Sequence, residues 1–272
     1  MATPVVFIHG LWLHASSWQP WVDLYREAGY DPIAPEWPGG PATVAEARAN
    51  PEAVAGFGIT AVADHFAGII AGLPEKPIVI GHSFGGLLTQ NLLGRGVAAA
   101  GVAIDPAPVK GVLALPVSAL RVASIALRNP ANRNKSVSLT EEQFRYGFGN
   151  ALSIEESREL WEKWATPSPG KPLFEAAVAN FSPNSPAKIA TDNGTRGPLL
   201  ITAGGHDHTV PAAISKATHK LYAKSPAVTD FHEFEGRDHW TCAAPGWEAV
   251  ADHALSWARE HSRTASTGAV GS

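Results

Sequence analysis

Short apolar runs rich in β-branched residues recur along the chain, and each is followed by glycine or proline and then by a longer helical pattern. These runs cover residues 5–8, 32–34, 78–80, 102–104 and 199–202. Ahead of the third run, apolar positions 62, 66, 69, 70 and 73 recur at helical spacing and end before Pro74. This alternation predicts an α/β fold with a mostly parallel, twisted sheet flanked by helices.

The alternation breaks after Asp105, because about 90 residues pass before the next run suited to a core strand, and that interval is too long for an ordinary connection. Two helical patterns fall inside it, at residues 139–152 and 154–165. We therefore predict a helical lid over residues 106–196, inserted before the last two core strands of a core formed by residues 1–105 and 197–261. Residues 262–272 have little to bury, which predicts a disordered tail.

The composition restricts the kinds of partner and the cellular compartment that we expect for this chain. The chain of 272 residues is long enough for one large α/β domain with such a lid. Its 21 Lys and Arg against 25 Asp and Glu give a formal charge of -4 with no long run of either sign, so we expect no nucleic-acid partner. The single cysteine, Cys242, excludes an intramolecular disulfide. The first apolar run leaves no room for a signal peptide, and no stretch has the length of a membrane span. We expect a cytoplasmic protein with no membrane partner.

A Gly-x-Ser-x-Gly motif, Gly81 to Gly85 with Ser83 at its centre, lies between a predicted strand and a helical pattern. In that context the motif is a tight turn whose glycines avoid collisions with neighbouring backbone, and it holds the serine at the carboxyl edge of the sheet. The same five-residue pattern elsewhere can be a simple helix N-cap. The position between strand and helix favours Ser83 as a nucleophile.

A serine hydroxyl is a poor nucleophile near neutral pH and needs a base. His239 follows an alternating run that predicts a final strand, so a loop at the strand's end can present it. Asp207 follows the predicted strand before it and is the candidate acid, in the chain order Ser, Asp, His. Asp105 also follows a strand and is the competing acid. Asp238 is interpreted as structural, because adjacent residues in an extended loop tend to point apart.

An acyl-transfer intermediate also needs donors for its oxyanion. The first predicted strand ends in residues 9–12, His-Gly-Leu-Trp, where backbone amides can turn toward the nucleophile. We predict that the backbone N–H groups of Leu11 and Phe84 form the oxyanion hole. Residues 206–208, His-Asp-His, are adjacent in sequence and have no clear third partner, which argues against zinc. We expect no metal and no cofactor.

The chain resembles the α/β-hydrolase superfamily over about residues 4 to 260, through His9-Gly10, Gly81-x-Ser83-x-Gly85, Asp207 ahead of Val210-Pro211, and His239. The early first strand and residues 9–12 followed by Trp18 are similar to the compact members that include plant esterases and hydroxynitrile lyases, and the lid resembles that of cofactor-free haloperoxidases. The resemblance implies the α/β-hydrolase fold and a triad of Ser83, Asp207 and His239. Members with an aspartate nucleophile are disfavoured by the serine. Residues 35–39 depart from the pattern of many relatives, because they place a bulky aromatic and an acid in a loop at the carboxyl edge of the sheet. We interpret these two residues either as part of the pocket or as loop packing.

Five tryptophans are predicted to line an apolar pocket above the nucleophile: Trp12, Trp37, Trp161, Trp164 and Trp240. Such a pocket favours a small, largely apolar ester or lactone, cleaved through an acyl-enzyme on Ser83, so the expected partner is a small-molecule substrate. A non-hydrolytic lyase and a ligand-binding receptor are alternatives on the same fold. The plant lyases use a lysine near the base, which is missing near His239, and the complete triad argues against a receptor.

Overall fold

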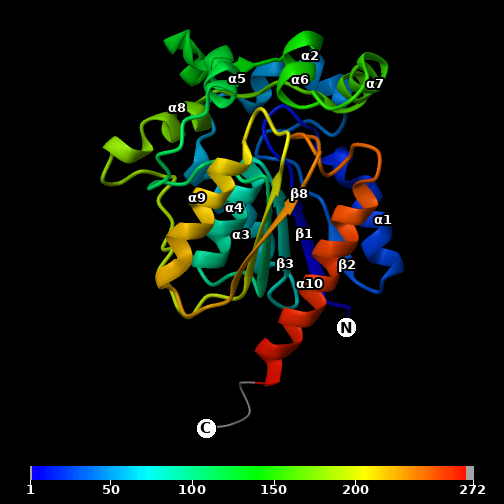
Figure 1. Cartoon of the computed structure of the whole chain (residues 1–272). Helices are drawn as coiled ribbons and strands as arrows, with labels where there is room; N and C mark the ends of the chain where they lie inside the picture. Colours follow the sequence, from blue (N-terminus) through cyan, green and yellow to red (C-terminus); the bar gives the residue numbers. More distant parts are fainter. Residues whose placement is uncertain (1, 268–272) are drawn as a thin grey trace.

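The computed structural model describes residues 2–267 and contains a six-stranded sheet in the order β2-β1-β3-β4-β7-β8. All five strand pairings are parallel. The strands are β1 (Pro4–Ile8), β2 (Asp31–Ile33), β3 (Ile78–His82), β4 (Ala100–Ile104), β7 (Leu199–Gly204) and β8 (Thr229–Phe234). Because the strands are parallel, their carboxyl ends share one edge, which lies at the top of Figure 1. The predicted α/β fold with a mostly parallel sheet is confirmed.

Helices cover both faces of the sheet (Figure 1). The helices α1 (Gln19–Glu27) and α10 (Trp247–Thr267) lie on one face, and α3 (Ile59–Ala71), α4 (Phe84–Gly94) and α9 (Ala212–Leu221) lie on the other. Strand β1 contributes side chains to the hydrophobic core on each face of the sheet, because side chains alternate along a strand. Val5 and Phe7 pack toward α1 and α10, and Val6 and Ile8 pack toward α3 and α4. A strand buried on both faces reads as a continuous apolar run, which is the pattern in the sequence.

The segment between β4 and β7 lies above the carboxyl edge of the sheet (Figure 1). It contains α5 (Val117–Leu127), β5 (Ser136–Val137), α6 (Glu141–Gly147), α7 (Ile154–Trp164), β6 (Ser168–Pro169) and α8 (Lys171–Ala177), with β5 and β6 paired antiparallel. The short α2 (Val44–Ala49) lies on the same side. Five 3-10 turns complete the described elements: η1 (Ala15–Trp18), η2 (Pro51–Val54), η3 (Pro130–Asn134), η4 (Ala179–Phe181) and η5 (Tyr222–Lys224). Backbone hydrogen bonds at 3.0 Å, from His14 to Trp164 and from Thr166 to Trp12, join the insertion to the core.

Local sequence explains where the helices of the insertion begin. Capping boxes start both α6, at Thr140, and α7, at Ser153. The predicted helix 139–152 is too long, since α6 ends at Gly147. Beyond it, the Ala151 N–H donates to a carboxylate oxygen of Asp238 at 2.9 Å, so a tertiary contact replaces the helical bond.

The C-terminal segment of the described chain is a helix. Helix α10 continues to Thr267, so residues 262–267 belong to this helix, and the disordered tail stays a prediction from the sequence. Extending an existing helix adds one hydrogen bond for each residue that is fixed, whereas starting a new one is costly. The remaining residues of the predicted tail, 268–272, lie outside the described residues. Within residues 2–267, no helix combines the length and the apolar character that a membrane crossing requires.

Candidate active site

Ser83 lies in the turn between β3 and α4 with φ 57° and ψ −119°. This left-handed conformation is unfavourable for a residue with a side chain and costs about 1–3 kcal/mol. Hydrogen bonds on both sides maintain it: the Ser83 N–H donates to the Ile104 carbonyl at 2.9 Å, and the Ser83 carbonyl accepts from the Ala107 N–H at 2.9 Å. The side chain is 4% exposed at the carboxyl edge of the sheet.

The glycines of the motif are required by close backbone contacts. A Cβ at Gly81 would lie 2.1 Å from the carbonyl oxygen of Gly85, and a Cβ at Gly85 would lie 2.0 Å from that of Ile8. Neither contact can be relieved by moving a flexible side chain. The strand, turn and helix therefore pack as closely as the sequence motif predicts.

His239 lies in the loop after β8 and is oriented by Asp207, which lies in the loop after β7. The His239 Nδ1 and Asp207 Oδ2 atoms are 2.6 Å apart, and both side chains are fully buried. The other carboxylate oxygen of Asp207 accepts from the N–H groups of Thr209 and Val210, each at 2.7 Å. A carboxylate fixed in this way selects the tautomer with a proton on Nδ1 and leaves the lone pair on Nε2.

The remaining nitrogen of His239 is available for the nucleophile. Nε2 is buried and has no hydrogen-bond partner among the described residues. The residue next to Ser83 contacts this loop directly, because His82 Nε2 donates to the His239 carbonyl at 2.7 Å and the two rings are 4.5 Å apart. No hydrogen bond between His239 and Ser83 Oγ is present in the described part of the chain, so the base and the acid are joined and the link to the nucleophile is a proposal.

Asp105, the competing acid, also lies near His239. It is fully buried after β4 and accepts from the Gly204 N–H at 2.7 Å, but it makes no hydrogen bond to His239. Burial raises the pKa of the Asp105 carboxyl well above its usual range, and the neighbouring Asp207 carboxylate raises it further. This shift favours the neutral carboxyl, which stabilises an imidazolium less well than a carboxylate does, and the contact of Asp207 with His239 makes Asp207 the better candidate acid. Asp238 caps the loop by accepting from the Trp240 and Ala151 N–H groups.

The two predicted oxyanion donors belong to segments that converge on the nucleophile. Phe84 is the first residue of α4 and follows Ser83 directly. Leu11 follows Gly10, where an added Cβ would lie 2.7 Å from Ser83 Cβ and 3.4 Å from Ser83 Oγ. The backbone of the first loop thus lies against the serine, as an oxyanion hole built from main-chain N–H groups requires. The two residues remain predicted donors.

A charged network that we did not predict fixes that first loop. The Glu36 carboxylate contacts His9 Nε2 at 3.1 Å and His14 Nε2 at 3.0 Å, and it accepts from the Ala15 N–H at 2.6 Å. Burial alone would raise the pKa of Glu36, but the two histidines and the amide outweigh it and leave this pKa below its ordinary value. Trp37 donates its indole N–H to the His9 carbonyl at 3.0 Å. The acid and the aromatic in residues 35–39 were the signal, and they support the loop that carries Leu11.

The predicted pocket tryptophans divide into groups. Trp164 and Trp240 lie 5.8 Å apart and pack with Phe144 and Phe148, and the Phe148 ring lies 4.9 Å from the His239 ring. Trp12 joins this cluster through Phe148, at 6.2 Å between ring centroids. An aromatic cluster therefore lies against the base through Phe148.

Trp37 and Trp161 lie away from this aromatic cluster. Trp37 packs against His9 in the loop network, with ring centroids 5.7 Å apart. Trp161 lines a cavity of about 230 Å³ together with Trp12, Leu139 and Arg48. The Arg48 guanidinium donates to the carbonyls of Trp161, Glu162 and Ala165, so it binds the C-terminal end of α7.

His206 and His208, which flank Asp207 in the sequence, do not point toward a common site. His206 is exposed, and His208 Nδ1 contacts the Tyr146 carbonyl at 2.9 Å. A buried trio of His82, Asp105 and His239 has potential ligand atoms within 4.8 Å of one another. Burial favours the neutral form of both His82 and Asp105, whose pKa values are shifted down and up respectively, and Asp207 already orients His239. This trio is a hydrogen-bonding site and is poorly suited to a cation.

The fold and the position of the site agree with one family of enzymes. The sequence pattern of the alpha/beta hydrolase family matches residues 5–253. The chain belongs to the alpha/beta hydrolase family. No curated protein matches the sequence at a significant level.

Solved structures of this alpha/beta hydrolase fold superimpose on nearly the whole chain. An extracellular alpha/beta-hydrolase from a Paenibacillus species, described as homologous to tobacco salicylic acid binding protein 2, has a TM-score of 0.66 at 20% identity and covers 93% of this chain and 98% of its own. A monoacylglycerol lipase from Paleococcus ferrophilus has a TM-score of 0.63 at 21% identity, with 96% and 97% covered. A methylesterase from Arabidopsis has a TM-score of 0.64 at 16% identity, with 95% and 99% covered. At these identities the likeness is one of fold.

Proposed function

We propose that the protein hydrolyses a carboxylic ester or lactone of a small, largely apolar substrate through an acyl-enzyme on Ser83. The observation that carries the proposal is the orientation of His239: its Nδ1 is held by Asp207 at 2.6 Å while Nε2 is buried and unpartnered among the described residues, next to the turn that bears Ser83. A base prepared in this way can take the proton of a neighbouring hydroxyl.

The reaction proceeds in two halves. His239 Nε2 removes the Ser83 Oγ proton as the oxygen attacks the ester carbonyl, and the N–H groups of Leu11 and Phe84 donate to the oxyanion. The imidazolium, stabilised by Asp207, then protonates the departing alcohol and leaves an acyl-serine. Water, deprotonated by the same nitrogen, attacks the acyl group, and the acid is released with Ser83 regenerated.

The surroundings of the base support an apolar substrate. Phe148 of the insertion packs against the imidazole of His239, and Trp240 of the His239 loop packs against Phe144 and Trp164 of the insertion; such surfaces bind acyl chains or rings rather than charged groups. The insertion would then act as a lid over the serine. The solved relatives named as a methylesterase and a monoacylglycerol lipase agree with ester chemistry by name. A cytoplasmic location stays a prediction from the sequence.

A fluorophosphonate probe, which phosphonylates an activated serine, tests this proposal together with p-nitrophenyl esters of increasing acyl length. We expect wild type to be labelled and to turn over the shorter esters, and Ser83→Ala to lose labelling and to lower kcat by a factor on the order of 10⁴ or more. Ser124→Ala is the matched control, because Ser124 is exposed and its hydroxyl contacts only the Arg121 carbonyl. Equal labelling of wild type and Ser83→Ala, or turnover that survives the substitution, would refute the proposal.

A further inference from the structure

Large apolar side chains are exposed on one part of the insertion. Leu113 is 77% exposed, Leu115 72%, Val117 82% and Phe181 88%. Single exposed apolar residues are common on protein surfaces, whereas a contiguous group of them marks an interaction site. We define the projecting apolar face as Leu113, Leu115, Val117, Leu120, Val178 and Phe181.

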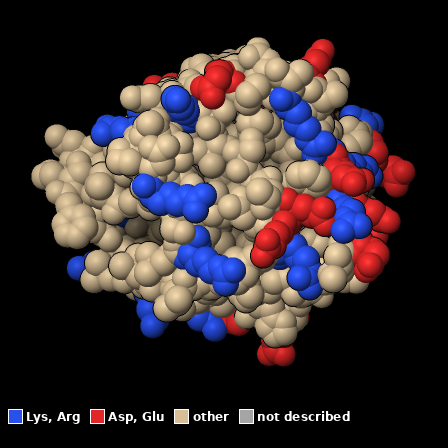
Figure 2. Space-filling view, turned by 90° about the horizontal axis from the view of Figure 1, so that it is seen from above, with Lys and Arg blue, Asp and Glu red and all other residues tan. Residues whose placement is uncertain are grey.

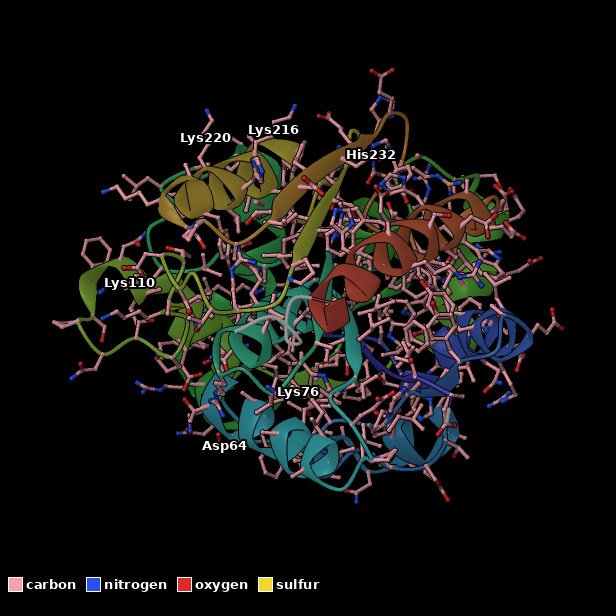
Figure 3. The ribbon with its side chains drawn as sticks, turned by 90° about the horizontal axis from the view of Figure 1, so that it is seen from below. Asp64, Lys76, Lys110, Lys216, Lys220 and His232 are labelled. Atoms are coloured by element: carbon pink, nitrogen blue, oxygen red, sulfur yellow. The ribbon has the colours of Figure 1, made fainter. Side chains whose placement is uncertain are left out.

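Hydrogen bonds hold the two segments of this face together. The Gly111 N–H donates to the side-chain oxygen of Asn180 at 2.7 Å, and the Asn180 amide donates to the Val112 carbonyl at 2.8 Å. The Lys110 ammonium donates to the Ser182 carbonyl. Lys110 lies in the part of the molecule that projects at the left of Figure 3. The segment 110–120 and the turn 178–182 are thus neighbours, and the face is a fixed surface.

The segment 106–140, which carries four of the six residues of this face, has charges of one sign. Residues 106–140 contain no Asp or Glu and carry five cations: Lys110, Arg121, Arg128, Arg133 and Lys135. On the other side of the insertion, α7 carries four glutamates, at positions 155, 156, 159 and 162. Figure 2 shows this asymmetry, since the projecting left-hand part is mostly tan and blue and most red atoms lie at the right. The whole chain has a formal charge of -4, so this positive segment runs against its overall balance.

We propose that the projecting apolar face and its flanking cations dock onto the surface of an anionic lipid bilayer. Exposed leucine, valine and phenylalanine side chains would enter the boundary between headgroups and acyl chains, and the arginine and lysine side chains would contact lipid phosphates. A second copy of the chain fits this face less well, because its own arginines and lysines would oppose one another. The proposal replaces the expectation from the sequence that no membrane is involved, and it is independent of the chemistry at Ser83.

Co-sedimentation with vesicles of phosphatidylcholine, with and without phosphatidylglycerol, tests the proposal without any assay of activity. We expect wild type to bind the anionic vesicles and to be released by high salt, because screening weakens charge attraction. Two double variants remove the two parts of the surface: Leu115→Ser with Phe181→Ser, and Arg128→Gln with Arg133→Gln. Each cation removed should lower the partition coefficient about fivefold, and the apolar pair on the order of tenfold.

Matched controls remove similar side chains from other surfaces. Ile154→Ser with Val228→Ser takes away two exposed apolar residues outside the face, each 46% exposed. Lys76→Gln with Lys224→Gln takes away two exposed cations that precede β3 and β8, at the opposite end of the molecule. Both controls should bind vesicles like wild type. All the substitutions are at exposed positions, so circular dichroism and melting temperature should stay unchanged.

Three results would overturn the proposal. In the first, wild type fails to sediment with anionic vesicles at low salt, and in the second, the face variants bind as well as the controls. In the third, sedimentation velocity would show self-association that the face variants abolish while vesicle binding is absent, which would assign the face to a second copy of the chain. None of these results depends on whether the protein is an esterase.

Discussion

Replacing Asp207 with asparagine should remove most of the proposed esterase activity while leaving the fold intact. In the structure, one carboxylate oxygen of Asp207 accepts from the Thr209 and Val210 N–H groups, each at 2.7 Å, and the other faces His239 Nδ1 at 2.6 Å. Those two donors will keep the amide oxygen of the asparagine. Its NH₂ group must then face His239, and it can only donate.

In the Asp207→Asn variant, that geometry favours the tautomer of His239 that cannot act as a base. With a donor opposite Nδ1, His239 carries its proton on Nε2 and cannot accept the proton of Ser83. We expect kcat/KM to fall by a factor on the order of 10⁴, which corresponds to about 5.5 kcal/mol of activation free energy. Fluorophosphonate labelling should slow by a similar factor, since it needs the same base. The assay is the rate of p-nitrophenyl ester hydrolysis.

Asp105→Asn is the matched control for this substitution. Burial and the Asp207 charge raise the pKa of Asp105 and so favour its neutral form, which asparagine resembles, and the asparagine can retain the bond from the Gly204 N–H. Activity should stay within about threefold of wild type. A buried acid with a raised pKa lowers the free energy of unfolding as pH rises from its ordinary value of 3.8 through the raised one, so the variant should become more stable than wild type as pH rises above 3.8. If Asp105→Asn abolished activity and Asp207→Asn did not, the assignment of the acid would be wrong.

Three further predictions concern the neighbourhood of the serine. Gly10→Ala should lower kcat at least tenfold, because its Cβ would lie 2.7 Å from Ser83 Cβ, whereas Gly68→Ala, with open space in α3, should leave kcat unchanged and raise the free energy of unfolding by about 1 kcal/mol. Burial, and to a lesser degree the neighbouring imidazole of His239, lowers the pKa of His82. Its contribution to the free energy of unfolding should therefore fall as pH drops below 6.5, and urea melts at a series of pH values should show a shallower fall for His82→Gln than for wild type. Glu36 has a lowered pKa, so its contribution is present above pH 4.5 and lost below it; Glu36→Gln should be less stable than wild type at pH 7 and similar at pH 3, and an equal loss at both would contradict the network.

The sequence was sufficient to predict features that depend on local patterns. Alternating β-branched and helical segments predicted the parallel sheet, because side-chain periodicity reports which faces of a strand or helix are buried. The glycines around Ser83 predicted a strand-to-helix turn, since a residue with a Cβ would place that atom 2.0–2.1 Å from a backbone oxygen. Short-range steric rules of this kind act within a few residues and can be deduced from sequence.

Tertiary structure decided the features that depend on distances between separate segments. Asp105 and Asp207 both follow strands that end at the same edge, and only the fold places Asp207 against His239 and buries Asp105 so that its pKa is raised. The same holds for Glu36, which follows β2 and contacts His9 in the loop after β1. It also holds for the tryptophans, some of which lie in the aromatic cluster next to His239, while others line the cavity or pack in the loop network. The strength of a hydrogen bond and the size of a pKa shift change when atoms move by fractions of an ångström. The packing of the whole core sets the relative positions of distant segments, and periodicity along the chain does not encode that packing.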